Sequence, residues 1–155
     1  MKGPIEKDGV LPTPTTKATP TLNAMQPVVP LRILVVDDDP IALEVARERL
    51  IRLGFDVTTR SESLGTTGWI LQNRPDCVLL DVMMPALSGS ELANVLRRRS
   101  VDTCIILHSS KPQSELDTLV RETGASGAIS KASDERRFAE TILLLTRRLA
   151  RGAEA

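Results

Sequence analysis

The sequence contains no tyrosine, and aromatic residues make up only 2 % of its 155 positions. The formal net charge is zero, with 20 basic and 20 acidic residues. Proteins that bind nucleic acids use clustered cations and, on single strands, aromatic rings on which bases stack. The basic run Arg97 to Arg99 is expected at the solvated end of a helix, where cations complement the helix dipole. No DNA-binding surface is therefore indicated.

Long apolar runs and cysteine clusters are also missing. Nowhere do about eighteen apolar residues follow one another, as a membrane-spanning helix requires, and the N-terminus lacks the apolar stretch of a signal peptide. Cys77 and Cys104 belong to no C-x-x-C or Cys/His cluster, so they fit small, reduced core residues. These absences predict a cytoplasmic protein without membrane insertion.

Proline is concentrated near the N-terminus. Residues 1–30 hold six of the ten prolines together with five threonines. Such a segment buries too little apolar surface to offset its ordering entropy, which predicts a disordered tail. One domain is then expected over residues 31–150, followed by a short C-terminal tail over 151–155.

From residue 31 onward, short apolar runs alternate with amphipathic stretches. The pattern predicts strands over 32–37, 55–60, 76–81, 104–109 and 126–131, and helices over 40–53, 64–73, 90–99, 113–123 and 134–150. Five βα units predict an α/β fold with an open parallel sheet and helices on both faces. Such folds bind ligands outside the C-terminal ends of their strands.

Carboxylates follow two of the predicted strands. Asp37, Asp38 and Asp39 end an apolar run, and Asp81 ends another. Acids crowded at one edge of a sheet repel each other, and a hard cation such as Mg²⁺ relieves the repulsion. Residues 37–40 also suit a plain turn and helix cap, because Asp is a good N-cap and Pro fits the first helical turn.

Other polar residues end the remaining strands. Ser109 and Ser110 end the fourth strand, and Lys131 ends the fifth. Because parallel strands bring these ends to one side, acids, a hydroxyl and an ammonium group should converge. Together they suit phosphoryl transfer, which needs a carboxylate nucleophile, a cation and donors around the phosphoryl oxygens.

In this arrangement the sequence resembles a response-regulator receiver domain of bacterial two-component signalling. The resemblance covers about residues 31–150. It rests on Val36-Asp37-Asp38, Leu80-Asp81, Met84-Pro85-Ala86-Leu87-Ser88-Gly89, Ser109-Ser110 and Gly124-Ala125-Ser126-Gly127 followed by Lys131. It implies a five-stranded, doubly wound parallel sheet of flavodoxin-like order 2-1-3-4-5 with five helices.

The resemblance also implies how the acids act. Asp81 would be the phosphoacceptor and a metal ligand, taking its phosphoryl group from a sensor histidine kinase or a histidine phosphotransfer protein. Asp38 would bind Mg²⁺ directly, Asp37 would act mainly through a metal-bound water, and Met83 would offer its backbone carbonyl. Asp39 falls outside this set and is expected to cap the first helix.

Near the last strands, the resemblance gives Ser109 the role of donating its hydroxyl to the phosphoryl group, and Lys131 that of pairing with its charge. Two positions depart from the family pattern. The fifth strand usually carries an aromatic residue, often Tyr, that swings inward, whereas Ala128 stands here. The lysine is normally followed by Pro across a cis bond, whereas Ala132 follows here, so we expect a trans bond and some displacement of Lys131.

Three functions remain open on the sequence. In the first, no output domain fits after residue 150, so the chain is a single-domain response regulator that signals through contacts with a downstream protein. It would catalyse its own phosphorylation at Asp81 and its own dephosphorylation, without being an enzyme in the ordinary sense. A phosphorelay intermediate is a variant of this hypothesis.

The second hypothesis is a pseudo-receiver that acts as a phosphorylation-independent docking or localisation module, as Ala128 and Ala132 would favour. The third is a phosphatase, because Asp37-Asp38-Asp39 also resembles the D-x-D motif of haloacid-dehalogenase-type enzymes. In that case Asp37 would be the nucleophile and Asp81 would be idle.

Two further features carry weaker expectations. His108 lies in an apolar strand and is expected to be a hydrogen-bonded core imidazole rather than a phosphocarrier. The last helix carries an apolar stripe of Leu143, Leu144, Leu145 and Leu149, broader than one helix face needs, which suggests a partner surface.

Overall fold

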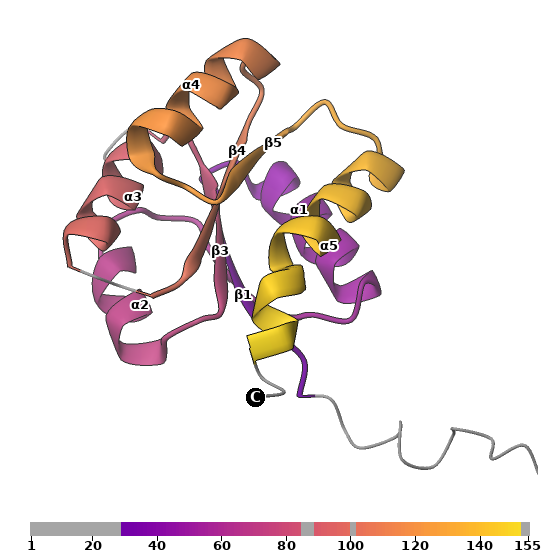
Figure 1. Ribbon diagram of the computed structural model, residues 1–155, viewed down its shortest axis with the longest axis horizontal. Helices are drawn as coiled ribbons and strands as arrows, with labels where there is room; N and C mark the ends of the chain where they lie inside the picture. The colour runs from indigo at the N-terminus through magenta and orange to yellow at the C-terminus, as the bar shows by residue number, and fades with distance from the viewer. Residues whose placement is uncertain (1–28, 85–88, 100–101, 153–155) are drawn as a thin grey trace, which may run out of the picture.

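The computed structural model describes residues 29–84, 89–99 and 102–152 (Figure 1). Most of the predicted N-terminal tail, the motif residues 85–88 and the last three residues lie outside the described residues. The elements run in strict alternation along the chain. They are β1 (Arg32–Val36), α1 (Pro40–Arg52), β2 (Asp56–Arg60), α2 (Thr66–Asn73), β3 (Cys77–Asp81), α3 (Gly89–Arg98), β4 (Cys104–Ser109), α4 (Gln113–Thr123), β5 (Gly127–Ser130) and α5 (Glu135–Gly152).

All five strands belong to one parallel sheet in the order β2-β1-β3-β4-β5. The predicted fold class is therefore confirmed, and every predicted element is found with its ends displaced by two residues or fewer. The strand order reverses beside β1, so the crevice for a ligand is expected at the C-terminal ends of β1 and β3.

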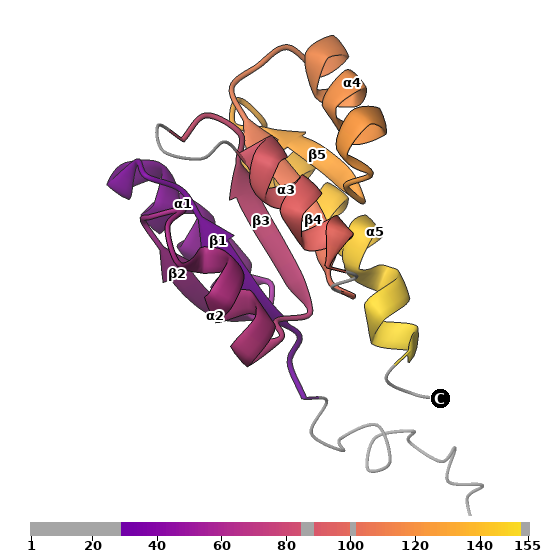
Figure 2. The same ribbon diagram turned by 90° about the vertical axis from the view of Figure 1, so that its left-hand side faces the viewer.

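Helices cover both faces of the sheet. Figure 1 shows α1 and α5 on one face and α2, α3 and α4 on the other, and Figure 2 shows α2 and α3 in front of the strands. A hydrophobic core lies on each face of the sheet, and alternate residues of a strand belong to opposite cores. Ile33 and Val35 pack on the side of α1 and α5, whereas Leu34 and Val36 pack on the opposite side. β1, β3 and β4 are buried along almost their whole length.

Local signals explain where α1 begins and ends. The Asp39 side chain accepts a hydrogen bond from the backbone N–H of Ile41 at 2.9 Å, and Pro40 occupies the first helical turn. Gly54 follows the helix with φ +93°, a conformation that glycine adopts without strain. The predicted capping role of Asp39 is confirmed.

Arg97 lies exposed in the last turn of α3, as predicted, and it has a second role. Its guanidinium donates to the carbonyl of Thr123 at 2.7 Å, at the C-terminus of α4. Arg97 therefore complements the end of a neighbouring helix as well as its own. The Arg97 side chain also lies against Gly124, where an added Cβ would clash with it.

Candidate functional site

The register of the sheet brings the acids of β1 and β3 together. Val36 pairs with Leu80, so Asp37 and Asp81 leave neighbouring strands at the same level. One oxygen each from Asp37, Asp38 and Asp81 lies within 4.8 Å of the other two. The structure thus places the three predicted metal-binding carboxylates in one cluster, which we call the acidic pocket.

Asp37 is the most deeply placed acid, with 1 % of its surface exposed. Its Oδ1 accepts the backbone N–H of Asp39 at 2.9 Å. Its Oδ2 lies 2.8 Å from the ammonium nitrogen of Lys131, but without hydrogen-bond alignment. Among the buried side-chain atoms that the structure describes, this oxygen alone has no hydrogen-bond partner. The charge of Lys131 is its partner among the described residues, and a bound cation would share this oxygen with Lys131.

Asp81 is also buried, with 2 % exposed surface. Its Oδ1 accepts the backbone N–H of Met83 at 3.1 Å and lies 3.4 Å from the Lys131 ammonium. No described residue forms a hydrogen bond with its Oδ2. Burial raises the pKa of Asp81 above its ordinary value; the charge of Asp37 acts in the same direction, while the Met83 N–H and Lys131 oppose it.

The remaining acids differ in exposure and in use. Asp38 is exposed at the rim of the acidic pocket, where a cation could still hold several waters. Asp39 faces α1 as its cap and is not part of the cluster. Met83 lies two residues after Asp81 in the chain and is 59 % exposed.

Lys131 reaches the acidic pocket although Ala132 replaces the expected Pro. The described residues contain no cis peptide bond, so the predicted trans bond is confirmed. The ammonium lies closer to Asp37 than to Asp81. Burial favours its neutral form, but the pairing with both acids outweighs burial and raises the pKa of Lys131.

Ser109 is held beside Lys131 by the last pair of strands. Its side chain is fully buried, and its hydroxyl accepts the backbone N–H of Lys111 at 3.1 Å. Its carbonyl accepts the backbone N–H of Lys131 at 2.8 Å. The hydroxyl keeps its own proton available for another acceptor. The Lys111 ammonium turns to Glu115 on α4, at 3.2 Å.

Three carboxylates with only oxygen donors fit a hard divalent cation such as Mg²⁺ better than a soft metal. The buried Oδ2 of Asp37, which faces the charge of Lys131 without an aligned hydrogen bond, supports this fit, since a cation beside it would reduce the repulsion between Asp37 and Asp81.

His108 lies behind the acidic pocket, opposite Asp81 in the register of β3 and β4. It is 7 % exposed, and its ring packs edge-on against Phe138 at 6.0 Å between centroids. Burial, together with the charge of Lys131, lowers the pKa of His108 to about 4. The predicted core position is confirmed, but no described residue forms a hydrogen bond with the imidazole, so the predicted hydrogen bonding is not found. The proximity of His108 to Lys131 could not be predicted from the sequence.

On α5, the apolar stripe divides between core and surface. Leu145 and Leu149 pack against the core, whereas Leu143 is 48 % and Leu144 65 % exposed. Ala128 is partly buried against the α2, α3 and α4 side of the sheet. None of the described helices combines the length and the apolarity needed to cross a membrane.

Comparisons with known proteins agree with this geometry. The family model described as "Response regulator receiver domain" matches residues 33–143. "Response regulator MprA" of Mycobacterium sp. (strain KMS) is 40 % identical over 83 residues, which are 54 % of this chain and 36 % of that protein. "Alkaline phosphatase synthesis transcriptional regulatory protein PhoP" of Bacillus subtilis is 30 % identical over 117 residues, 76 % of this chain and 49 % of PhoP. The chain thus matches between about a third and a half of these relatives.

Solved structures show the same fold. The chemotaxis protein CheY4 of Vibrio cholerae superposes with a TM-score of 0.68 at 22 % identity, covering 75 % of this chain and 98 % of CheY4. The Francisella response regulator 1452 receiver domain superposes with a TM-score of 0.69 at 22 % identity, covering 77 % and 98 %.

Proposed function

This chain belongs to the family of response regulator receiver domains, and on that premise we propose that Asp81 accepts a phosphoryl group from a phosphohistidine in a Mg²⁺-dependent reaction. The donor would be a sensor histidine kinase or a histidine phosphotransfer protein. A receiver domain is a signalling phosphoacceptor rather than a classical enzyme. The observation that supports the proposal most is the acidic pocket, in which Asp37, Asp38 and Asp81 each bring one oxygen within 4.8 Å of the others and the Lys131 ammonium lies beside two of the acids.

In the proposed reaction, an Asp81 oxygen attacks phosphorus and the P–N bond of the phosphohistidine breaks, so that the imidazole leaves with its electron pair. Asp37, Asp38 and Asp81, with the backbone carbonyl of Met83, would hold Mg²⁺, which supplies positive charge to the phosphoryl oxygens. Positioning and neutralisation are then most of the work that the protein performs.

Two donors near the pocket complete the proposal. The Ser109 hydroxyl, whose oxygen already accepts from Lys111, would donate its proton to a phosphoryl oxygen. The Lys131 ammonium would shift from Asp37 toward the new negative charge, as its position between the two acids allows.

For the whole chain we propose a cytoplasmic single-domain regulator, with a tail over 1–30, a receiver over 31–150 and a short end over 151–155. It would signal through contact with a downstream protein, and the exposed Leu143 and Leu144 on α5 support such a contact. A phosphorelay intermediate would use the same pocket chemistry.

A pseudo-receiver is the second candidate, and the observation in its favour is the absence of the usual aromatic and Pro at Ala128 and Ala132. The contact of Lys131 with both acids weighs against it, because the lysine reaches the pocket without that Pro. The phosphatase hypothesis is weaker still, since both Asp37 oxygens are already engaged or pressed against Lys131.

The test is labelling with a radioactive small acyl phosphate and Mg²⁺. The wild type should take up label, and Asp81→Asn should lose it by at least about 100-fold, as expected when a nucleophile is removed. Asp39→Asn is the matched control, because Asn also caps helices and this residue lies outside the cluster. Label in Asp81→Asn but not in Asp37→Asn would favour the phosphatase hypothesis, and an unlabelled wild type would favour the pseudo-receiver.

A further inference from the structure

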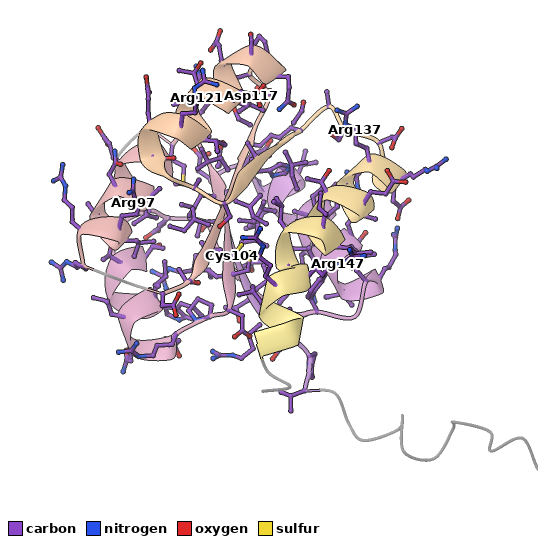
Figure 3. All side chains as sticks on the ribbon, in the orientation of Figure 1. Arg97, Cys104, Asp117, Arg121, Arg137 and Arg147 are labelled. Atoms are coloured by element: carbon purple, nitrogen blue, oxygen red, sulfur yellow. The ribbon has the colours of Figure 1, made fainter. Side chains whose placement is uncertain are left out.

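The N-terminal ends of β3 and β4 carry a pair of cysteines at the edge of the sheet opposite the acidic pocket. Cys77 and Cys104 are direct partners in the parallel register. Both are free thiols, and both belong to the core under α1 and α5. Figure 3 shows Cys104 beside α5 in the interior of the molecule. The two residues are far apart in sequence, and only the register makes them neighbours.

The geometry of a parallel ladder is compatible with a covalent bridge between them. Neighbouring strands lie about 4.7–4.9 Å apart, and residues directly opposite each other point to the same face. A disulfide accepts Cα separations of about 4.4–6.8 Å. The two thiols also influence each other's ionisation, since the interaction with Cys77 lowers the pKa of Cys104 to about 7, and the interaction with Cys104, together with burial, raises the pKa of Cys77.

We propose that Cys77 and Cys104 form a reversible intramolecular disulfide when the protein meets a hydroperoxide. The Cys104 thiolate attacks one oxygen of the hydroperoxide and the O–O bond breaks, which gives a sulfenic acid and expels hydroxide or an alkoxide; this leaving group takes up the proton that the Cys104 thiol lost and leaves as water or an alcohol. The Cys77 sulfur then attacks the Cys104 sulfur, the S–S bond forms, and hydroxide leaves and takes the Cys77 proton as water. Two thiols are oxidised by two electrons, and one hydroperoxide is reduced.

Exposure decides which sulfur reacts first. Cys104 is 8 % exposed, whereas Cys77 is fully buried, so an oxidant reaches the pair through Cys104. Cys77 is then placed to resolve the sulfenic acid before further oxidation. A thiol reductant can return such a disulfide to two thiols by thiol–disulfide exchange, which makes the modification reversible.

The bridge would also alter how α5 sits on the sheet. The Cys104 sulfur lies 4.0 Å from the carbonyl oxygen of Leu145 on α5 and donates its proton there. The Leu145 side chain fills the space over Gly127, where an added Cβ would lie 2.7 Å from its Cδ1. Oxidation removes the thiol donor from a closely packed contact between β4 and α5.

The experiment treats the reduced full-length chain with one equivalent of hydrogen peroxide, followed by denaturation, thiol alkylation and peptide mass mapping. We expect a peptide pair joined by Cys77 and Cys104 that has lost the mass of two hydrogen atoms, and that a thiol reductant restores to two alkylatable cysteines. In Cys77→Ala, the same treatment should leave Cys104 as a sulfenic acid that a dione reagent traps.

Three results would overturn the proposal. The first is Cys104 as a sulfinic or sulfonic acid with Cys77 still a thiol. The second is a disulfide between two molecules. The third is two unmodified thiols after treatment of the folded wild type. Because the measurement on the wild type alone distinguishes these results from the expected one, the test does not depend on whether Cys77→Ala folds.

Discussion

The two ends of β3 each carry an aspartate, and the two carboxylates lie in different surroundings. Before the strand, Asp76 accepts the backbone N–H of Arg32 at 2.8 Å, and its own backbone N–H and carbonyl pair with Arg32 and Cys104. After the strand, Asp81 faces Asp37 in a buried pocket, and its pKa is raised. Asp76 completes the ladder of the sheet, whereas Asp81 stays available for chemistry.

The comparison shows that the hydrogen bonds formed by a carboxylate and its neighbours distinguish the structural acid, Asp76, from the functional acid, Asp81. At the Asp76 end, neighbouring groups also find partners, since Arg32 donates to the Asn73 carbonyl at 2.7 Å and Thr103 to the Pro75 carbonyl at 2.8 Å. At the Asp81 end, the Asp37 Oδ2 has no hydrogen bond. This oxygen instead faces the ammonium of Lys131 at 2.8 Å, a charge that a bound cation would share.

Replacing the basic side chain at each end of β3 should give the largest difference in the free energy of unfolding. Lys131→Met deletes the ammonium beside Asp37 and Asp81 while keeping an apolar stem. Without divalent ions, chemical denaturation should show the free energy of unfolding lower by about 2 kcal/mol, less than for a fully buried pair because Lys131 is partly exposed. Arg32→Met should cost less than about 1 kcal/mol, since its guanidinium is exposed. Equal losses would contradict the comparison.

The second largest difference between the two ends of β3 should be in the affinity for Mg²⁺. Asp38→Asn removes a charged ligand from the acidic pocket, so we expect Mg²⁺ affinity measured by calorimetric titration to fall at least about tenfold, or 1.4 kcal/mol. Asp76→Asn keeps an acceptor for the Arg32 N–H and should leave the affinity unchanged. An equal decrease in both variants would mean that Mg²⁺ responds only to the net charge of the protein.

Neutralising the two acids should change stability in opposite directions. The raised pKa of Asp81 means that the folded state binds its proton more tightly than the unfolded state, so ionised Asp81 costs stability above the ordinary carboxyl pKa. At neutral pH and without metal, Asp81→Asn should therefore raise the free energy of unfolding by about 1 kcal/mol. Asp76→Ala should lower it by about 1 kcal/mol, because the Arg32 N–H loses its acceptor. The same sign in both variants would refute this distinction.

Another effect, confined to acidic pH, concerns His108, next to the pocket. Its lowered pKa means that the unfolded chain binds a proton near pH 6.5 while the folded chain stays neutral until about 4. Stability should fall on acidification through this window, by up to about 1.4 kcal/mol per pH unit. His108→Leu should remove that part of the slope in denaturation curves recorded at several pH values. An unchanged slope would show that His108 does not titrate as its burial implies.

Much of this molecule could be predicted from the sequence because its signals are local. Apolar runs and helical periodicity located all five βα units, and the rule that parallel strands share one edge brought Asp37 and Asp81 together. The cap at Asp39 followed from residue type. The strand order itself came only from the family resemblance, because periodicity does not say which strands are neighbours.

Other features depend on register and side-chain conformation, which local patterns do not encode. The pairing of Cys77 with Cys104 needs the exact alignment of β3 on β4, across a connection that includes α3. The preference of Lys131 for Asp37 over Asp81 depends on how the chain turns after β5. The contact of Arg97 with α4 requires knowing how two helices pack.

The central claim is that Asp81, and not another acid of the pocket, carries the phosphoryl group. Its most direct test is to phosphorylate the protein with a small acyl phosphate and Mg²⁺, reduce it with borohydride, and map the peptides by mass spectrometry. Borohydride converts an aspartyl phosphate to homoserine, so the account predicts homoserine at position 81 and unmodified aspartate at positions 37 and 38. Homoserine at position 37 with intact Asp81 would contradict it.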